Sequence, residues 1–284
     1  MSAPMIDLAP GHKIGLIVEN PVLLAPAAAG FGDRLPRVEG GVPGAIVAGP
    51  VSAAGHGYGR TGLVEVEGGV LALPSGFSRS ARRAVERYAG AWERVGCPIV
   101  VQLVDETAAD FARAAARVAG AHAVAGIEWA IPADLAPSSL AEGLRAAQRT
   151  ADLPLWVKLP WGRAGDLAER AVGAGAVGLV LAQPPAGAVL RLGSQSAAEV
   201  VRGALHGPLL FAMLLHALHA LAQQSLPCAL IAAGSIFTPG QMAQALAAGA
   251  QAVQLDAVVW SEPAIVKTMV TAWQAGQAGT VPSS

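Results

Sequence analysis

The stretch ALIAAGSIFTPGQMAQALAAGAQAVQL, residues 229–255, carries the pattern that decides the fold. It begins and ends with short apolar runs, 229–233 and 252–255, which predict two strands that are apolar on both faces. Strands of that kind belong to a parallel sheet covered by helices. Between them Thr238 precedes Pro239, the order that favours a helix beginning at the proline. The stretch therefore predicts a strand, a helix and a second, parallel strand.

The same unit recurs along the whole chain. Apolar runs predict eight strands, at residues 22–25, 45–48, 98–104, 123–128, 155–158, 177–182, 229–233 and 252–255. Helical periodicity predicts helices at residues 78–93, 107–119, 138–149, 165–173, 197–224, 239–248 and 262–275. Eight βα units predict a single (β/α)8 TIM barrel over residues 1–284. An open doubly wound sheet is disfavoured because its Gly-rich first turn is missing. The segment 63–73 (LVEVEGGVLAL) predicts an inserted β-hairpin near the barrel mouth.

The composition excludes several classes of protein. The 284 residues include 19 Lys+Arg and 20 Asp+Glu, and 53% of them are hydrophobic. A nucleic-acid reader would carry a basic excess, and a disordered chain would be poor in apolar residues. No apolar run reaches the ~18 to 20 residues of a membrane span, and no secretory signal begins the chain. We therefore expect a cytoplasmic protein with neither nucleic acid nor membrane as a partner.

The two cysteines, Cys97 and Cys228, each stand beside a proline at the start of an apolar run. Neither has a CxxC neighbour or an adjacent histidine. We expect them to be buried thiols that pack as small hydrophobic side chains rather than redox or nucleophilic groups.

Chemistry in a TIM barrel takes place at the carboxyl ends of its strands. This chain places few polar side chains there for an enzyme: Gln102, Glu128, Lys158, Gln183, Ser235 and Asp256. Lys158 has two interpretations. As a Schiff-base nucleophile it needs a pKa lowered by burial or by a cationic neighbour, and no such neighbour is visible. As a structural lysine it pairs with Glu128 one strand away or with Asp256 across the mouth, and this second interpretation is favoured.

Six segments carry further information: NPVLLAPAAAGFGD (20–33), GAIVAGPVS (44–52), LPLWVKLP (153–160), AGAVGLVLAQ (174–183), HGP (206–208) and the stretch 229–255 quoted above. In this order they resemble successive motifs of the dihydroorotate dehydrogenase family. The resemblance implies an FMN-binding barrel that oxidises dihydroorotate to orotate in pyrimidine synthesis. It also implies that FMN lies across the strand ends, with its phosphate on the last two βα loops.

The resemblance assigns roles to individual residues. The cofactor-binding positions are Ala25, Lys158, Gly207, Gly234, Ser235, Asp256 and Ala257. Gln183 stands at the place of a substrate-binding asparagine. Lys158 is the one clearly retained catalytic residue, and Asp134 is the polar group nearest to the place of the family's base. No metal site is implied.

The chain departs from the family pattern at most of the reactive positions. Gly49 and Pro50 replace a lysine and a hydroxyl residue, while Ala130 and Ala72 replace asparagines. No thiol or hydroxyl stands at the base position, although a placed base is worth about 10² to 10⁴ in rate. Asp256 replaces a glycine where the phosphate should rest. Its carboxylate repels the phosphate or caps the neighbouring helix, and either leaves the phosphate site impaired.

Two functional hypotheses follow from these departures. In the first, the chain is an FMN-dependent oxidoreductase of dihydroorotate or a related small cyclic substrate. In the second, it is a degenerate paralogue, catalytically silent and without FMN, that has a structural or regulatory role. The retained motifs favour the first hypothesis and the altered pocket favours the second.

Three further features have ordinary and functional interpretations. His216 and His219 share a helix face at metal-ligand spacing, but no third ligand is near in sequence, so surface histidines are favoured. The loop 55–60 is either a lid or an ordinary surface loop. Trp129 and Trp161 stand near strand ends and are expected to fill the mouth.

Few charges are available to cover the surface, since only 14% of the residues are charged. Apolar helix faces such as FAMLLHALHALAQQ, residues 211–224, are therefore expected to contact another subunit. This predicts a homodimer or a subunit of a larger complex, and the resemblance implies a dimer as well.

Overall fold

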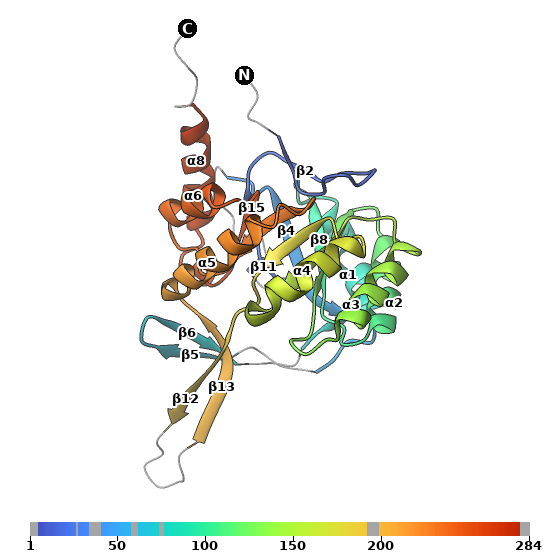
Figure 1. Ribbon diagram of the computed structural model, residues 1–284, viewed down its shortest axis with the longest axis horizontal. Coiled ribbons are helices and arrows are strands. Elements are labelled where there is room, and N and C mark those ends of the chain that lie inside the picture. Colours follow the sequence, from blue (N-terminus) through green and yellow to red (C-terminus); the bar gives the residue numbers. More distant parts are fainter. Residues whose placement is uncertain are drawn as a thin grey trace.

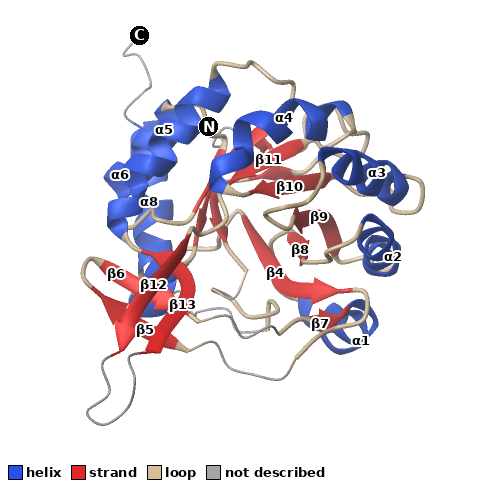
Figure 2. Cartoon of the chain, turned by 60° about the horizontal axis from the view of Figure 1, so that its bottom comes forward, coloured by secondary structure: helices blue, strands red, loops and turns tan. Residues whose placement is uncertain are grey.

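A closed barrel of parallel strands forms the centre of the molecule (Figure 2). The computed structural model describes residues 5–26, 28–33, 41–57, 62–73, 77–191 and 199–278. The barrel strands are β3 (Val22–Leu24), β4 (Ala45–Ser52), β8 (Ile99–Leu103), β9 (Val124–Ala130), β10 (Leu155–Leu159), β11 (Gly178–Leu181), β14 (Ala229–Ala233) and β15 (Ala252–Leu255). Because β3 pairs with both β15 and β4, the sheet closes on itself. The predicted TIM barrel is confirmed, and each predicted strand is present.

Helices surround this barrel (Figures 1 and 2). They are α1 (Ala81–Trp92), α2 (Ala108–Ala119), α3 (Pro137–Gln148), α4 (Ala164–Gly173), α5 (Phe211–Ala222), α6 (Pro239–Ala247), α7 (Ala257–Ser261) and α8 (Ile265–Ala278). The N-caps follow the sequence signals: Thr107 accepts a hydrogen bond from the Asp110 N–H, and Thr238 forms a reciprocal capping box with Gln241. The short helix α7 had no counterpart among the predicted helices, which began again only at residue 262.

A small antiparallel sheet lies to one side of the barrel (Figure 1). It consists of β12 (Ala186–Arg191), β13 (Glu199–His206), β6 (Gly69–Ala72) and β5 (Leu63–Val66), in that order. The predicted hairpin 63–73 is β5 and β6. The predicted helix 197–224 is wrong over β13, because its neighbouring valines suit a strand and β13 pairs with both β12 and β6. Helix α5 begins only after Gly207 and a 3₁₀ turn at Pro208–Leu210.

Side chains at alternating positions of the barrel strands point inward and form layers. The lower layers are apolar and include Val47, Val100, Trp156, Val180 and Ile231. The short hairpin of β1 (Ile6–Asp7) and β2 (Ile17–Val18) packs against this end, where Trp156 Nε1 donates to the carbonyl oxygen of Leu8 at 2.9 Å. The layer nearest the carboxyl ends of the strands is polar.

In the described part of the chain, no helix is both long and apolar enough to span a bilayer.

Candidate functional site

Four polar side chains meet inside the barrel. Gln102 on β8 and Gln254 on β15 both donate to the carboxylate of Glu128 on β9, at 2.7 and 2.5 Å. Lys158 on β10 donates from Nζ to Gln254 Oε1 at 3.0 Å, and its Nζ lies 3.8 Å from Glu128 Oε1. All four side chains are more than nine-tenths buried. Each charge is therefore held by partners within the chain, and the cluster is electrically neutral as a whole.

The pairing of Lys158 decides between the partners expected for it. Glu128 is the acidic partner, as one alternative stated, whereas Asp256 contacts a different residue. Gly49, where the family pattern has a lysine at the end of the second strand, leaves little room for a side chain. A Cβ on Gly49 would lie 3.0 Å from the Cβ of Gln102 and 3.1 Å from its carbonyl oxygen.

The loops after β14 and β15 meet at Asp256. Oδ2 of Asp256 lies 3.0 Å from Nδ1 of His206 and 2.8 Å from the position of a Cβ on Gly234. Oδ1 is buried and makes no hydrogen bond with the residues that the structure describes. The alternative in which the side chain of Asp256 caps the neighbouring helix is wrong, since no side-chain hydrogen bond caps α7. The carboxylate thus fills the space next to Gly234 where a side chain would stand. The following residue, Ser235, has a left-handed backbone with φ of 60°.

Between the described residues at these strand ends, the cavity is very small. A space of about 10 Å³ remains between residues that follow β10, β11, β14 and β15, among them Trp161, Pro184, Leu205, His206 and Asp256. That is about the space of one water molecule. Ligand pockets usually measure about 300 to 1,000 Å³.

The two tryptophans differ in direction. Trp161 lines the mouth cavity, as expected. The expectation for Trp129 is wrong, because its ring stacks on Phe111 of α2 with centroids 3.9 Å apart, and its Nε1 donates to the carbonyl oxygen of Asp105. Since Glu128 points inward, the next residue along the strand must point outward toward the helices.

Other residues assigned by the resemblance lie away from the mouth cavity or form hydrogen bonds with the backbone. Gln183 Nε2 donates to the carbonyl oxygens of Ile131 and Lys158 at 2.6 and 3.0 Å, which ties neighbouring strand ends together. Asp134 is exposed on the loop after β9 and does not line the mouth cavity. Ala25 is buried, and its N–H donates to the carbonyl oxygen of Leu255.

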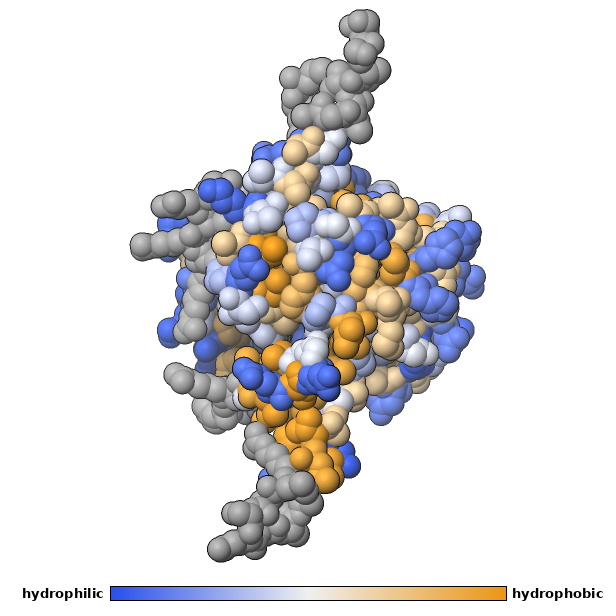
Figure 3. Space-filling view, turned by 90° about the vertical axis from the view of Figure 1, so that its left-hand side faces the viewer, coloured by the Kyte–Doolittle hydropathy of each residue, from blue (hydrophilic) through white to orange (hydrophobic). Residues whose placement is uncertain are grey.

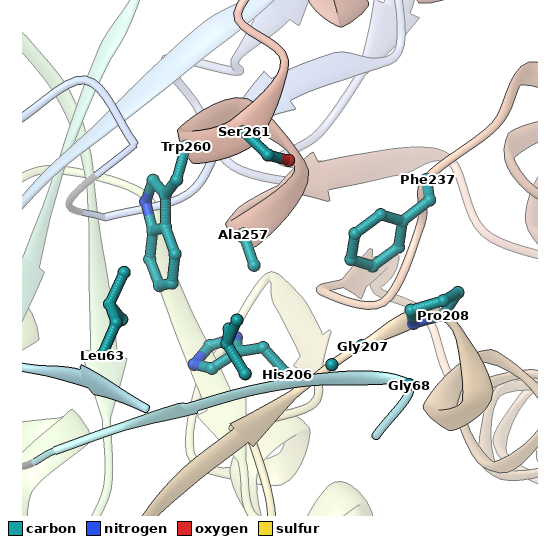
Figure 4. A pocket seen from close by; sticks show the side chains of 11 residues that line it. Leu63, Gly68, His206, Gly207, Pro208, Phe237, Ala257, Trp260 and Ser261 are labelled. Atoms are coloured by element: carbon teal, nitrogen blue, oxygen red, sulfur yellow. The ribbon is translucent and has the colours of Figure 1, made fainter. Parts of the chain in front are cut away.

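A separate apolar pocket of about 310 Å³ lies between the small sheet and α7 (Figure 4). Gly207 and Ala257, both predicted cofactor-binding positions, line this pocket and not the mouth cavity. His206 lines both spaces and so stands between them.

A wider cleft of about 650 Å³ lies beyond β4 and β8. Asp105, Glu106 and Asp110 give it an acidic lining, and none of the predicted cofactor-binding residues is among the described residues that line it. Burial raises the pKa of Asp105, whose Oδ1 accepts the N–H of Ala53 at 2.8 Å. An acidic cleft of this kind does not suit a phosphate dianion.

The loop 55–60 borders this cleft. Its first residues are held in place, because His56 pairs through its backbone with Ser78 and Gly55 donates to Ser52 Oγ at 3.0 Å. Residues 58–60 lie outside the described residues, so the choice between a lid and a surface loop stays a prediction.

The cysteines and the paired histidines fit their ordinary interpretations. Cys97 and Cys228 are half-buried against the core, and burial raises their pKa to about 12 and about 11. His216 and His219 are exposed on α5, and the described residues contain no group of three potential ligands for a metal ion.

Two residues that shape the site were not predicted. Gln254 lies within the apolar run AVQL, and its inward position on an alternating strand was the available signal. The contact of His206 with Asp256 joins residues 50 apart in sequence, and no local pattern indicates it.

Comparisons with known proteins agree with this architecture. Neither a scan against protein-family models nor a search of curated proteins finds a match. Among solved structures, the chain is similar to the crystal structure of DHODH in complex with ferulenol from Eimeria tenella. The TM-score is 0.73 at 17% sequence identity, and the match covers 97% of this chain and 85% of that one. From the closed barrel, the added small sheet and this likeness together, we conclude that the chain has the fold of dihydroorotate dehydrogenase.

Proposed function

We propose that this chain is a catalytically silent barrel of the dihydroorotate dehydrogenase fold that binds no FMN and has a structural or regulatory role. The observation that carries the proposal is the small size of the cavity that the described residues leave where the last βα loops meet. About 10 Å³ of space at the ends of β10, β11, β14 and β15 is far below the volume of ordinary ligand pockets. The residues that the resemblance assigns to FMN do not fit that cofactor.

The residues at the place that the resemblance assigns to the FMN phosphate support the same proposal. An anion at this place would rest on backbone N–H groups after β14 and β15. Instead the carboxylate of Asp256 covers Gly234 and contacts His206. A second anion about 4 Å away would be repelled by about 1 to 4 kcal/mol at high to intermediate dielectric.

The reactive groups point to the same conclusion. Among the described residues that line the mouth cavity, the titratable side chains are His206 and Asp256, and these contact each other. Lys158 and Glu128 are held in the internal cluster. Among the described residues that line this cavity, His206 is the candidate base, and a space of about 10 Å³ leaves no room beside it for a substrate.

The alternative is an FMN-dependent oxidoreductase of dihydroorotate or a related cyclic substrate. The retained Lys158 and the fold favour it. Its difficulty is that Nζ of Lys158 is directed at Gln254 within the strand layer, 7% of the residue being exposed.

Spectroscopy and thermal denaturation of the purified chain test the proposal. We expect colourless protein, no flavin released on denaturation, and no rise in Tm with added FMN. A ligand at 100 times its Kd would stabilise the fold by about 2.7 kcal/mol, so binding would be visible as a higher Tm. A flavin-containing dihydroorotate dehydrogenase is the positive control. Yellow protein that dihydroorotate bleaches under anaerobic conditions would establish the alternative instead.

We further propose that the chain associates with a second copy. Large apolar side chains are exposed on the small sheet and around the start of α5: Leu63, Leu190, Val200, Leu209 and Met213. Figure 3 shows apolar residues gathered at the lower end of one face, where the small sheet lies. Sedimentation equilibrium should give a dimer that Leu209→Ser weakens. A monomer at every concentration would contradict the proposal.

A further inference from the structure

The apolar pocket beside α7 has walls from four separate segments. These are the β5–β6 hairpin, the end of β13, the loop after β14, and α7, and they contribute Leu63, Val70, His206, Phe237, Ala257 and Trp260. In Figure 4 the rings of Trp260 and Phe237 stand on opposite sides of the space. Its volume is about 310 Å³. An engineered apolar cavity of about 150 Å³ in another protein binds benzene, so this space suits a molecule of one or two fused rings.

His206 gives this apolar space one polar atom. Its Nδ1 lies 3.0 Å from Oδ2 of Asp256, and its ring meets Trp260 edge-on at 5.2 Å. In the neutral imidazole, donation from Nδ1 to the carboxylate leaves Nε2 as a hydrogen-bond acceptor. Nε2 makes no hydrogen bond with any residue that the structure describes. With the imidazole in this form, the pocket presents an acceptor that is held in one orientation by a buried carboxylate.

The charge around the pocket restricts what it can hold. Asp256 stands behind the imidazole, so an anionic ligand would be repelled and would lose its hydration against apolar walls. A cation would also be desolvated there without a carboxylate in direct contact. A neutral ligand that donates one hydrogen bond avoids both costs.

We propose that this pocket binds a small neutral aromatic molecule with a hydroxyl group, whose O–H donates to Nε2 of His206 while its ring packs between Trp260 and Phe237. This assignment goes beyond the silent-barrel proposal and does not depend on it, because the pocket lies on the other side of His206 from the mouth cavity.

Calorimetric titration of the full chain with three matched probes tests the ligand class. 2-Naphthol carries the hydroxyl, naphthalene lacks it, and 2-naphthoate carries a charge. We expect 2-naphthol to bind roughly twofold to tenfold more tightly than naphthalene, the effect of one net hydrogen bond, and 2-naphthoate to bind least. No detectable binding of 2-naphthol up to its solubility limit, or equal binding of all three probes, would overturn the proposal.

Two variants test the place of binding. Ala257→Leu adds side-chain volume inside the pocket and should abolish 2-naphthol binding, whereas Ala188→Leu on the exposed face of β12 should leave it unchanged. The double variant His206→Phe with Asp256→Asn removes Nε2 without leaving a buried carboxylate. It should bind 2-naphthol no more tightly than naphthalene. Circular dichroism and Tm establish that each variant is folded. Retained binding in folded Ala257→Leu would refute the location, whatever the outcome of the FMN experiment.

Discussion

Replacing Lys158 by methionine tests whether the internal polar cluster is structural. Nζ lies 3.8 Å from Glu128 Oε1, a separation at which unit charges attract by about 4 kcal/mol at an effective dielectric constant of about 20. Removing one partner of a buried pair leaves the other charge uncompensated, and this typically costs about 3 to 5 kcal/mol. Gln254 Oε1 also loses its donor. We expect Lys158→Met to lower the free energy of unfolding by that amount.

Urea denaturation followed by tryptophan fluorescence measures this loss, and thermal denaturation should show a Tm lower by roughly 6 to 20 °C. Adding Glu128→Gln to Lys158→Met removes the stranded charge and should recover at least half of the lost stability. The matched control is Lys13→Met. Lys13 pairs with Asp152 at 2.6 Å on the surface, where such pairs contribute about 0 to 1 kcal/mol. If Lys158→Met costs no more than Lys13→Met, Lys158 does not hold Glu128 and the structural interpretation is wrong.

Three further outcomes are expected. Burial raises the pKa of Asp105, so the folded state loses stability as the pH rises from the unfolded pKa through the folded one. Asp105→Asn should therefore raise Tm at neutral pH but not at acid pH. An equal rise at both pH values would contradict this. Burial raises the pKa of Cys97 to about 12 and that of Cys228 to about 11. Both thiols should therefore react slowly with an aromatic disulfide reagent in the native chain and quickly in urea. Rapid reaction of the native chain would contradict this. A Cβ on Gly143 would lie 2.6 Å from the ring of Trp129. Gly143→Ala should therefore lower the free energy of unfolding, measured in urea, by about 1 to 3 kcal/mol. An unchanged midpoint would show that the ring can move.

The barrel could be predicted because its signals are local. Runs such as GLVL in β11 and ALIAA in β14 are apolar on both faces, and that property follows from their position between helices. The strand β13 could not be predicted in the same way. One of its two pairing partners, β6, lies far away in sequence, and a stretch that ends in Gly-Ala-Leu-His carries no mark of that partner. The helical signal of residues 211–222 is real, and the prediction extended it too far back along the chain, over β13.

The site was predictable only in part, for a related reason. Strand ends identify which residues reach the mouth, and this placed Lys158 and Glu128 together. The alternation of side chains along a strand also predicts that Trp129 points outward, since its neighbour Glu128 points inward, and the interpretation of Trp129 did not use this. The contacts that a side chain makes across the mouth cannot be predicted in the same way. Asp256 has His206, Gly234 and the helix α7 near it, and only the three-dimensional arrangement shows that it contacts His206.

The internal cluster bears on the proposed silent barrel, because its polar groups have their partners within the chain. A polar layer at the ends of barrel strands is costly when its groups lack partners, and an active site keeps some groups free so that a ligand can complete them. Here Gln102 and Gln254 together occupy both oxygens of Glu128, and Gln254 also accepts from Lys158. A ligand that reached Lys158 would compete with Gln254 and Glu128, which already stand next to Nζ. In the proposed silent barrel, the contacts that stabilise this polar layer are therefore the ones that hold Lys158 within it.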